Sequence, residues 1–593
     1  MSCRLLDLVS LACLASIAGP LGSLGGPLAS VGGCLGPLAG PLTRSLASLA
    51  GPLTRAAVFL VAFWGLGGQA CLAQQACEKL AELQLTKASI TSAAVVPEGP
   101  IPGRPQNAPP IVAPARCVVQ GVARPTSDSE IGFEVWLPLE GWNGKYQQVG
   151  NGGWAGAIPV GSLVRAVERG YAAAGTDDGH KSSGAGDATW AIGHPEKVID
   201  FGWRAVHQTS VQAKAVVRAF YGREPDYNYF VGCSDGGREA LSEAQRFPED
   251  FDGIVAGAPA YDWSHHFTGF IWNEQGLLAE PGSAIPPAKL PAIQAAAVAA
   301  CDSLDGVRDG LVEDPRSCLF DPAVMTCKGA DGGDCLTVPQ VTALKKVYAG
   351  PKNPRTGKQI YPGYSPGTEG APGSWGRWIV DSPPENAIQF AFGNSYYGHA
   401  VFEDRDWDYR SLDFDGDVEF ADRKAGVVIN ANNPDLRSFR ASGGKLIVYH
   451  GWGDAAIAPL SSIEYYEEVA AFLKRFPDGR SDAQRPVGDF FRLFMAPGLG
   501  HCAGGIGANH FGNDGFVGDG IPGDPERDVL AALERWVEKG QAPERLIGTG
   551  TAVEDSSKTL TRPLCAYPLV ARYMGSGDAN VAASFSCAAA GPR

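Results

Sequence analysis

A serine flanked by glycines occupies a position that suits nucleophilic catalysis. Residues 232–236 read Gly-Cys-Ser-Asp-Gly and fit the pattern G-x-S-x-G, with Ser234 at its centre. In this pattern the serine sits on a sharp strand-to-helix turn, where glycines leave room for it. Five-residue matches are weak alone, but a buried strand is predicted at 227–231 and a helix at 238–246, as the turn requires. We therefore predict that Ser234 is a nucleophile.

A serine nucleophile needs a histidine that takes its proton. Of the nine histidines, only His450, His501 and His510 follow residue 434. His501 lies just after a predicted strand, at the carboxyl end of the sheet, where sites of open α/β sheets gather. His450 lies on a buried strand, which favours a structural role, and His510 in a glycine-rich loop is the weaker alternative. We predict that His501 is the base.

The base needs a carboxylate that orients it, and in α/β-hydrolases the chain order is serine, acid, histidine. Asp454 follows a predicted strand at 445–450 and stands between Ser234 and His501. Taken alone, each of the three is better explained as a turn residue in a polar loop. Three loops in the right order, each at the end of a core strand, favour a catalytic triad.

An oxyanion hole should use the backbone N–H of Asp235, the residue after the nucleophile, together with an N–H from an earlier loop. Residues 150–153 read Gly-Asn-Gly-Gly, and Gly153 is the predicted second donor. An ordinary glycine turn is the alternative for that residue.

Strands alternate with helices on both sides of these motifs, which predicts a parallel sheet covered on both faces, the core of an α/β-hydrolase. The predicted strands are 131–136, 146–149, 171–175, 227–231, 254–256, 445–450 and 490–495, and the predicted helices are 203–220, 238–246, 459–475 and 528–539.

The core is predicted to be split by a large inserted lid domain. From 263 to 434 the chain is rich in Gly, Pro, Asp and aromatic residues and its periodicity is weak. The predicted organisation is a leader at 1–73, the first part of the core at 74–262, the lid at 263–434 and the second part of the core at 435–593. A large insertion of this kind is tolerated in a loop of the scaffold.

The N-terminal segment has the features of a secretory signal. Arg55 precedes an apolar run at 56–66, which is too short for a membrane span, and cleavage is predicted after Ala73. Residues 1–53 are of low complexity and cannot specify a core. The mature chain is predicted to have no membrane anchor and to be secreted or periplasmic.

Ten cysteines remain after position 73, an even number that suits five disulfides in an oxidising compartment. Cys233 directly precedes Ser234 and Cys502 directly follows His501. If the nucleophile and the base meet, these two cysteines come within disulfide reach.

The arrangement Cys-Ser, Asp, His-Cys resembles the tannase and feruloyl esterase family, whose bacterial members include mono-(2-hydroxyethyl) terephthalate hydrolases. The resemblance extends from about residue 77 to the C-terminus, including a closing segment from Thr561 to Cys587. It implies the pairs Cys77–Cys117, Cys301–Cys318, Cys327–Cys335 and Cys565–Cys587 beside Cys233–Cys502.

A calcium ion is predicted in the lid. Residues 301–311 carry three aspartates around glycine turns, and hard oxygen ligands of this kind suit Ca²⁺, although a solvated acidic turn is an equal reading on chemistry alone. The EF-hand spacing is missing. The resemblance implies a structural calcium site with side-chain ligands Asp302, Asp305 and Asp309 and carbonyl ligands Val307 and Leu311.

The net charge of −15, without a basic run after the leader, argues against nucleic acid or an anionic membrane as a partner. We predict a serine esterase for small aromatic esters, feruloyl-type esters first, with galloyl esters or terephthalate half-esters as alternatives. The same triad permits acyl transfer to an alcohol, and a non-catalytic, calcium-stabilised binding protein is a hypothesis from a different class. Six lid aromatics either stack on the substrate ring or form lid core: Trp375, Trp378, Phe390, Phe392, Tyr396 and Tyr397.

Overall fold

The computed structural model of the protein describes residues 76–590, except 102–109, 183, 279, 477–485 and 514–522. The predicted leader and signal peptide lie outside the described residues. The described residues all belong to one compact unit, so the predicted boundaries at 263 and 434 between core and lid stay predictions.

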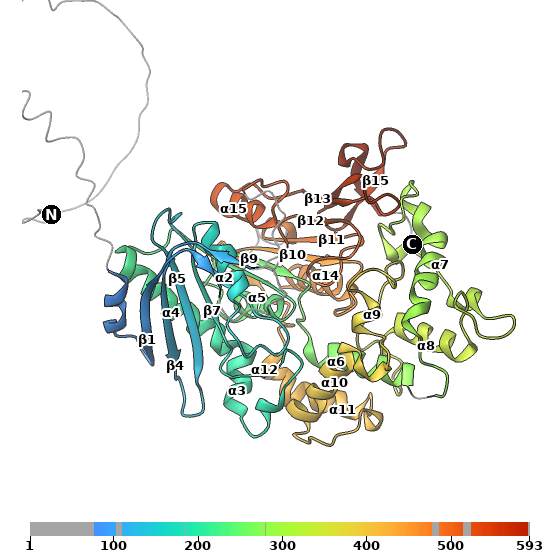
Figure 1. Ribbon diagram of the computed structural model, residues 1–593, viewed down its shortest axis with the longest axis horizontal. Helices are drawn as coiled ribbons and strands as arrows, with labels where there is room; N and C mark the ends of the chain where they lie inside the picture. Colours follow the sequence, from blue (N-terminus) through green and yellow to red (C-terminus); the bar gives the residue numbers. More distant parts are fainter. Residues whose placement is uncertain are drawn as a thin grey trace, which may run out of the picture. The chain divides into compact units, whose positions relative to one another are not determined.

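A nine-stranded sheet forms the centre of the protein (Figure 1). Six neighbouring strands run parallel: β7, β6, β8, β9, β10 and β11. The strands β1, β4 and β5 extend the sheet through antiparallel pairs. In spatial order the strands are β1 (Ala88–Val96), β4 (Arg116–Ala123), β5 (Ile131–Pro138), β7 (Ala172–Thr176), β6 (Lys145–Val149), β8 (Tyr227–Cys233), β9 (Gly253–Gly257), β10 (Lys445–Gly451) and β11 (Phe491–Ala496).

Successive side chains of each strand point to opposite faces of this sheet. Helices cover both faces. Leu446 and Val448 of β10 pack in the core cluster under α4 (Ala205–Tyr221), α5 (Asp235–Arg246) and α14 (Leu460–Arg475). Ile447 and Tyr449 of the same strand pack in the other cluster, under α2 (Val160–Glu168) and α15 (Val529–Lys539). The predicted α/β core is confirmed.

The chain between β9 and β10 adds helices and turns, and its described residues add no strand to the central sheet. Two aromatic-rich clusters hold this segment together and also include Ala455, Ala456 and Ile457, which follow β10. Its principal helices are α6 (Trp263–Leu278), α7 (Leu290–Cys301), α8 (Val338–Ala349), α9 (Trp375–Trp378), α10 (Ile388–Ser395), α11 (Gly416–Ala421) and α13 (Arg437–Ala441).

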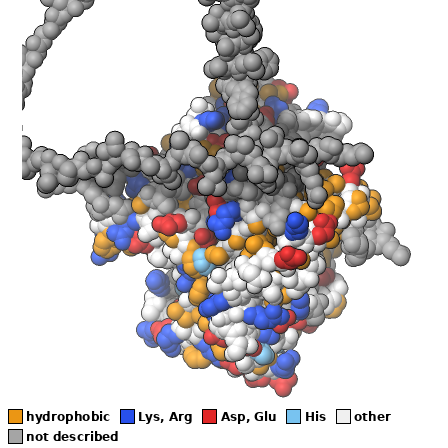
Figure 2. Space-filling view, turned by 90° about the vertical axis from the view of Figure 1, so that its left-hand side faces the viewer, with side chains coloured by type: hydrophobic (Ala, Val, Ile, Leu, Met, Phe, Trp, Pro, Cys, Tyr) orange, Lys and Arg blue, Asp and Glu red, His pale blue; other side chains and the backbone are white. Residues whose placement is uncertain are grey.

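Two small antiparallel sheets follow β11. One contains β12 (Gly507–His510), β13 (Arg545–Thr551) and β14 (Thr559–Cys565), and the other contains β15 (Leu569–Tyr573) and β16 (Phe585–Ala589). In the described part of the chain, no helix is both long and apolar enough to cross a bilayer. On the face shown in Figure 2, the described acidic and basic side chains are interspersed.

His180 is buried beside the loop that follows β6. One ring nitrogen lies 2.6 Å from the carbonyl oxygen of Trp154, and the ring stacks on Trp190 with 3.7 Å between centroids. Burial lowers the pKa of His180 from 6.5 to about 4, although its contacts with the carbonyls of Trp154 and Asp178 act in the opposite direction. The folded protein therefore holds this imidazole neutral.

The free energy of unfolding should fall as the pH decreases from 6.5 to about 4. Over this range the unfolded chain binds a proton at His180 and the folded chain does not, so acid favours unfolding. His180→Gln keeps a donor for the Trp154 carbonyl but cannot titrate, and it should have a shallower dependence of the thermal midpoint on pH. Equal slopes for the two proteins would contradict this role of His180.

Candidate active site

Ser234 lies on the turn between β8 and α5, with a positive φ of 66° and a ψ of −121°, a combination that non-glycine residues rarely adopt. A side chain at Gly232 would collide with the carbonyl oxygen of Gly236, because its Cβ would lie 2.4 Å from that atom. A Cβ at Gly236 would lie 2.9 Å from the carbonyl oxygen of Asn151. The two glycines of the motif therefore permit the strained turn that presents Ser234.

His501 and Asp454 converge on this serine, as predicted. Nε2 of His501 lies 2.9 Å from Oγ of Ser234, and Nδ1 of His501 lies 2.9 Å from Oδ2 of Asp454. Asp454 follows β10 and His501 follows β11, and these strands are parallel neighbours that end at the same edge of the sheet. The three residues thus form one continuous chain of hydrogen-bonding groups.

Asp454 is almost fully buried and is held as a carboxylate. Its Oδ1 accepts the backbone N–H groups of Ala456 and Ile457 at 2.8 and 2.9 Å. Burial alone would raise the pKa of Asp454, but the charge of His501 and hydrogen bonds from His450 and His501 hold it well below its ordinary value. The carboxylate therefore stays ionised beside the imidazole.

His450 contacts Asp454, which its predicted position on a strand did not indicate. It is completely buried, with Nε2 3.2 Å from Oδ2 of Asp454 and Nδ1 2.8 Å from Oγ of Ser462. The prediction of a structural role agrees with this position, and the contact with Asp454 adds a second histidine behind the carboxylate. His510 ends β12 and lines a different recess.

The loop that carries His501 is closed at several points. A bridge pairs Leu499 with Gly505, and the side chains of Asn509 and Asn513 donate to the carbonyls of Gly504 and Cys502. The disulfide Cys233–Cys502, with a Cα–Cα distance of 5.9 Å, ties this loop directly to the residue before Ser234. His501 is thereby fixed against Ser234.

The other four disulfides join the cysteines that were expected to pair. They are Cys77–Cys117, Cys301–Cys318, Cys327–Cys335 and Cys565–Cys587.

Asp235 and Gly153 both line the cavity that contains Ser234. No described residue accepts a hydrogen bond from the backbone N–H of either one. The side chain of Asp235 is buried and accepts from Nε of Arg238 at 2.6 Å. Burial raises the pKa of Asp235 to about 7, against the opposing charge of Arg238. Both N–H groups are therefore free to bind an oxygen of a ligand.

The cavity has a volume of about 720 Å³, within the range of roughly 300–1,000 Å³ that small-molecule sites occupy. Trp263, Phe267 and Phe270 of α6 form one wall, and Trp378 and Phe392 come from later in the insertion. The ring of Trp378 meets the ring of His501 edge to face, with 5.1 Å between centroids. The cavity thus combines flat apolar walls with the polar triad.

Of the six insertion aromatics considered from the sequence, Trp378 and Phe392 line the cavity. Trp375, Phe390, Tyr396 and Tyr397 are buried in the core of the insertion. Trp263, Phe267 and Phe270 of α6 were not predicted to line a cavity, because the same spacing of apolar residues is typical of a core helix. Arg377, an exposed cation at the cavity, was also missed.

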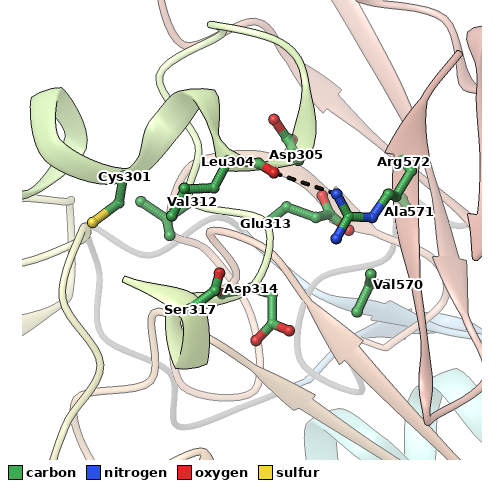
Figure 3. A pocket seen from close by; sticks show the side chains of 10 residues that line it. All are labelled: Cys301, Leu304, Asp305, Val312, Glu313, Asp314, Ser317, Val570, Ala571 and Arg572. Carbon is green, nitrogen blue, oxygen red and sulfur yellow. Dashed lines mark hydrogen bonds between the residues drawn. The ribbon is translucent and has the colours of Figure 1, made fainter. Parts of the chain in front are cut away.

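The predicted calcium loop lies against the C-terminal strands (Figure 3). Oδ1 and Oδ2 of Asp302 accept the backbone N–H groups of Asp309 and Gly310, and Oδ1 of Asp305 accepts that of Val307. Asp309 forms an ion pair with Arg562, and the Leu304 carbonyl accepts from Arg572 of β15 at 3.4 Å. Three carboxylates on one short, tightly turned loop supply hard oxygen ligands of the kind that suits Ca²⁺. Their oxygen atoms are not gathered within 4.8 Å of one another, and they bond instead to backbone N–H groups and to Arg562.

Leu311, at the end of this loop, packs against the segment that carries His501. A Cβ at Gly498 or at Gly507 would lie 3.0 or 2.9 Å from side-chain atoms of Leu311, so both glycines are in direct contact with it. Leu311 shares a small core cluster with Ala508 and Leu560, against which Ile506 packs.

The family model for tannase and feruloyl esterase matches residues 117–588. The chain belongs to this family. The esterase is 45% identical over 529 residues to an uncharacterized esterase of Xanthomonas campestris pv. campestris, covering 87% of this chain and 91% of the relative. It is 35% identical to a probable feruloyl esterase of Arthroderma benhamiae, covering 78% of this chain and 83% of the relative.

The esterase is also 33% identical to a mono(2-hydroxyethyl) terephthalate hydrolase of Piscinibacter sakaiensis, covering 82% of this chain and 87% of the relative. Its fold matches the crystal structure of feruloyl esterase B from Aspergillus oryzae with a TM-score of 0.76 and 29% identity, over 86% of this chain and 99% of that one. The protein is a carboxylic ester hydrolase with an α/β-hydrolase fold, and the hypothesis of a non-catalytic binding protein is set aside.

Replacing Cys233 and Cys502 together by alanine should lower the free energy of unfolding by about 2–5 kcal/mol, the usual effect of losing a native disulfide. It should also reduce kcat, because the His501 loop loses its tie to the nucleophile. Chemical unfolding and ester hydrolysis measure the two effects.

The double variant Cys327→Ala with Cys335→Ala is the matched control. Its disulfide closes a separation of only 8 residues, and neither cysteine lines the cavity that contains Ser234, so kcat should stay at the wild-type value. Unchanged kcat in the Cys233/Cys502 variant would show that the tie does not position the base.

Proposed function

We propose that the protein is a serine esterase that hydrolyses aromatic carboxylic esters, feruloyl-type esters foremost, through a covalent acyl-enzyme. The observation that carries this proposal is the hydrogen-bonded chain Asp454–His501–Ser234 at the wall of an aromatic-lined cavity. In this geometry Ser234 acts as the nucleophile, His501 as the base and Asp454 as the acid that orients the base.

Acylation begins when His501 Nε2 takes the proton of the Ser234 hydroxyl as its oxygen attacks the ester carbonyl carbon. The imidazolium that forms is stabilised by Asp454, which is buried and ionised. The tetrahedral oxyanion accepts hydrogen bonds from the backbone N–H groups of Asp235 and Gly153. These donors are fixed before the reaction and need no reorganisation when charge develops.

The intermediate collapses when the bond between the acyl carbon and the alcohol oxygen breaks and His501 gives its proton to that oxygen. Water then enters, His501 takes one of its protons, and the hydroxide attacks the acyl-enzyme. Collapse of the second intermediate returns the proton to Ser234 and releases the acid. The same acyl-enzyme would react with an alcohol in place of water, which is the acyl-transfer alternative.

The cavity walls support an aromatic acyl group. Phe267, Phe392 and Trp378 line the space beside Ser234, where offset or edge-to-face contacts with a ring contribute about 0.5–1.5 kcal/mol per pair beyond the area they bury. Relatives named for feruloyl esters and for a terephthalate half-ester also favour aromatic acids. Galloyl esters and terephthalate half-esters are the alternative substrates.

We also propose that a structural Ca²⁺ ion is bound by the carboxylates of Asp302, Asp305 and Asp309 and by the carbonyls of Val307 and Leu311. The support is the chemistry of this donor set and the disulfide Cys301–Cys318, which joins the ends of the segment. When bound, the ion would hold the loop against the C-terminal strands and take no part in the reaction.

Five disulfides support a secreted or periplasmic location, since such bonds persist in oxidising compartments. The predicted exclusion of nucleic acid as a partner stays a prediction.

The wild-type protein should hydrolyse p-nitrophenyl acetate and, with higher kcat/KM, methyl ferulate. Ser234→Ala should reduce kcat by at least about a thousandfold, because the nucleophile is lost. Ser92→Ala, an exposed serine on β1, is the control that should keep wild-type rates. A panel of methyl ferulate, methyl gallate and mono-(2-hydroxyethyl) terephthalate ranks the acyl preference. Full activity in Ser234→Ala would disprove the mechanism, and a higher kcat/KM for another ester would replace the feruloyl assignment.

Removing calcium with a chelator should lower the thermal midpoint, and adding it back should restore the midpoint, because the ion binds only the folded chain. At a free concentration of a hundred times Kd the stabilisation would be about 2.7 kcal/mol. Asp305→Asn should abolish this response, whereas Asp334→Asn, an exposed lid aspartate, should keep it. A wild-type midpoint that ignores both chelator and calcium would refute the site.

A further inference from the structure

Three carboxyl groups are buried together behind the turn that carries Ser234. Asp235 and Glu239 belong to the first two turns of α5, and Asp178 lies on the loop that follows β7. One oxygen of each group lies within 4.8 Å of the other two, and each residue is at most 1% exposed. Asp178 and Glu239 do not line the cavity that contains Ser234, so the reaction described above gives them no part.

Arg238 is the cation that accompanies these acids. Its Nε donates to Asp235 at 2.6 Å, and its two terminal nitrogens donate to the carbonyls of Gly202 and Phe201 at 2.6 and 2.9 Å. Neither carboxyl oxygen of Asp178 accepts a hydrogen bond from a donor group in the described part of the chain. An ionised carboxylate without such partners is costly at this depth, so a neutral acid is expected in the cluster.

The surroundings of Asp178 favour its neutral form. Burial, the charge of Glu239 and a hydrogen bond with Glu239 raise the pKa of Asp178 well above its ordinary value. The charge of Asp235 acts in the same direction, and that of Arg238 opposes it. A protonated carboxyl group is a donor, and Oε1 of Glu239 is an acceptor that no donor of another described residue uses.

Glu239 also contacts the loop that presents Gly153. Its Oε2 accepts the backbone N–H of Asn151 at 2.9 Å. The carbonyl of Asn151 accepts from the N–H of Gly236, and its side-chain amide donates to the carbonyl of Thr176 at 3.0 Å. Asn151 stands two residues before Gly153, so these contacts fix where the turn places the Gly153 N–H.

The backbone of Asp178 is tied to the same assembly. Its N–H donates to Oγ1 of Thr176 at 3.1 Å, next to the carbonyl that Asn151 holds. Asp178 has a positive φ of 59°, a region that Asp and Asn enter more readily than most residues. Asparagine can therefore replace Asp178 with little added backbone strain.

We propose that Asp178 is a positioning residue that acts as a neutral acid: its O–H donates to Glu239, and Glu239 holds Asn151 so that the Gly153 N–H meets the oxyanion. The inference rests on the proposed esterase function and adds a support behind the oxyanion hole. Because the oxyanion forms only after attack, a displaced Gly153 N–H destabilises the transition state and leaves substrate binding unchanged.

The test measures kcat and KM for methyl ferulate and p-nitrophenyl acetate. Glu239→Ala removes the acceptor of the Asn151 N–H and should lower kcat about a hundredfold at unchanged KM, as one displaced oxyanion donor would. Asp178→Gly permits the positive φ but removes the acid, and it should lower kcat in the same way. Asp178→Asn supplies an amide N–H in place of the acid O–H and should restore kcat to near the wild-type value.

The infrared difference spectrum between the wild type and Asp178→Asn tests the proton directly. It should contain the carbonyl band of a protonated carboxylic acid at neutral pH. Glu243→Ala is the matched control for the kinetics, because Glu243 is as deeply buried in α5 but faces Asp250. This variant should keep the wild-type kcat whatever its thermal midpoint.

Wild-type kcat in folded Glu239→Ala would overturn the inference, as would an Asp178→Asn variant as slow as Asp178→Gly. Absence of the infrared band would also overturn it, and this result decides the matter if Glu239→Ala fails to fold. Each of these outcomes leaves the esterase function intact. Hydrolysis of neither ester by the wild type would overturn the proposed function and this inference together.

Discussion

The contact between Ser234 and His501 joins residues that are 267 positions apart, and the order of the parallel strands makes it possible. β8, β9, β10 and β11 are successive neighbours, so the loops that follow β8, β10 and β11 leave the sheet at one edge. The long insertion between β9 and β10 adds little to the entropic cost of closure, because that cost rises only with the logarithm of loop length. The Cys233–Cys502 bond then fixes the distance between two of the three loops.

The ionisation of Asp454 depends on how its burial is compensated. A carboxylate taken out of water is costly unless charges and hydrogen bonds compensate it. Asp454 receives two backbone N–H groups, the imidazole of His501 and the imidazole of His450. These groups keep it charged in a place where an isolated carboxyl would take up a proton. Asp235 is different, because Arg238 only partly offsets the effect of burial and the pKa of the Asp235 carboxyl is raised.

The sequence was most informative where a short motif and a buried strand coincided. The parallel strands were predicted to within about two residues, because their continuous apolar runs and adjoining glycines leave few alternatives. β1 was not predicted, since its edge position leaves alternating exposure without a clear apolar face, and β4 beside it was also missed. The triad followed from order and spacing.

The cavity walls could not be predicted in the same way. Trp375 and Trp378 are three positions apart in the same short helix, yet one is buried in the insertion and the other borders His501. Packing between distant segments decides which of two similar side chains faces the cavity, and the local sequence pattern does not indicate the outcome. The same holds for His450, whose strand position was clear but whose contact with Asp454 depends on the turn after β10.

Leu311 has a consequence for how such an enzyme diversifies. It belongs to the insertion, but it wedges between Gly498 and Gly507, the two ends of the loop that carries His501. Exchanging the insertion between relatives would therefore also exchange the support of the His501 imidazole. A productive chimera has to transfer residues 302–311 and 498–507 as a pair, so these two stretches form one inherited unit although 186 residues separate them in the chain.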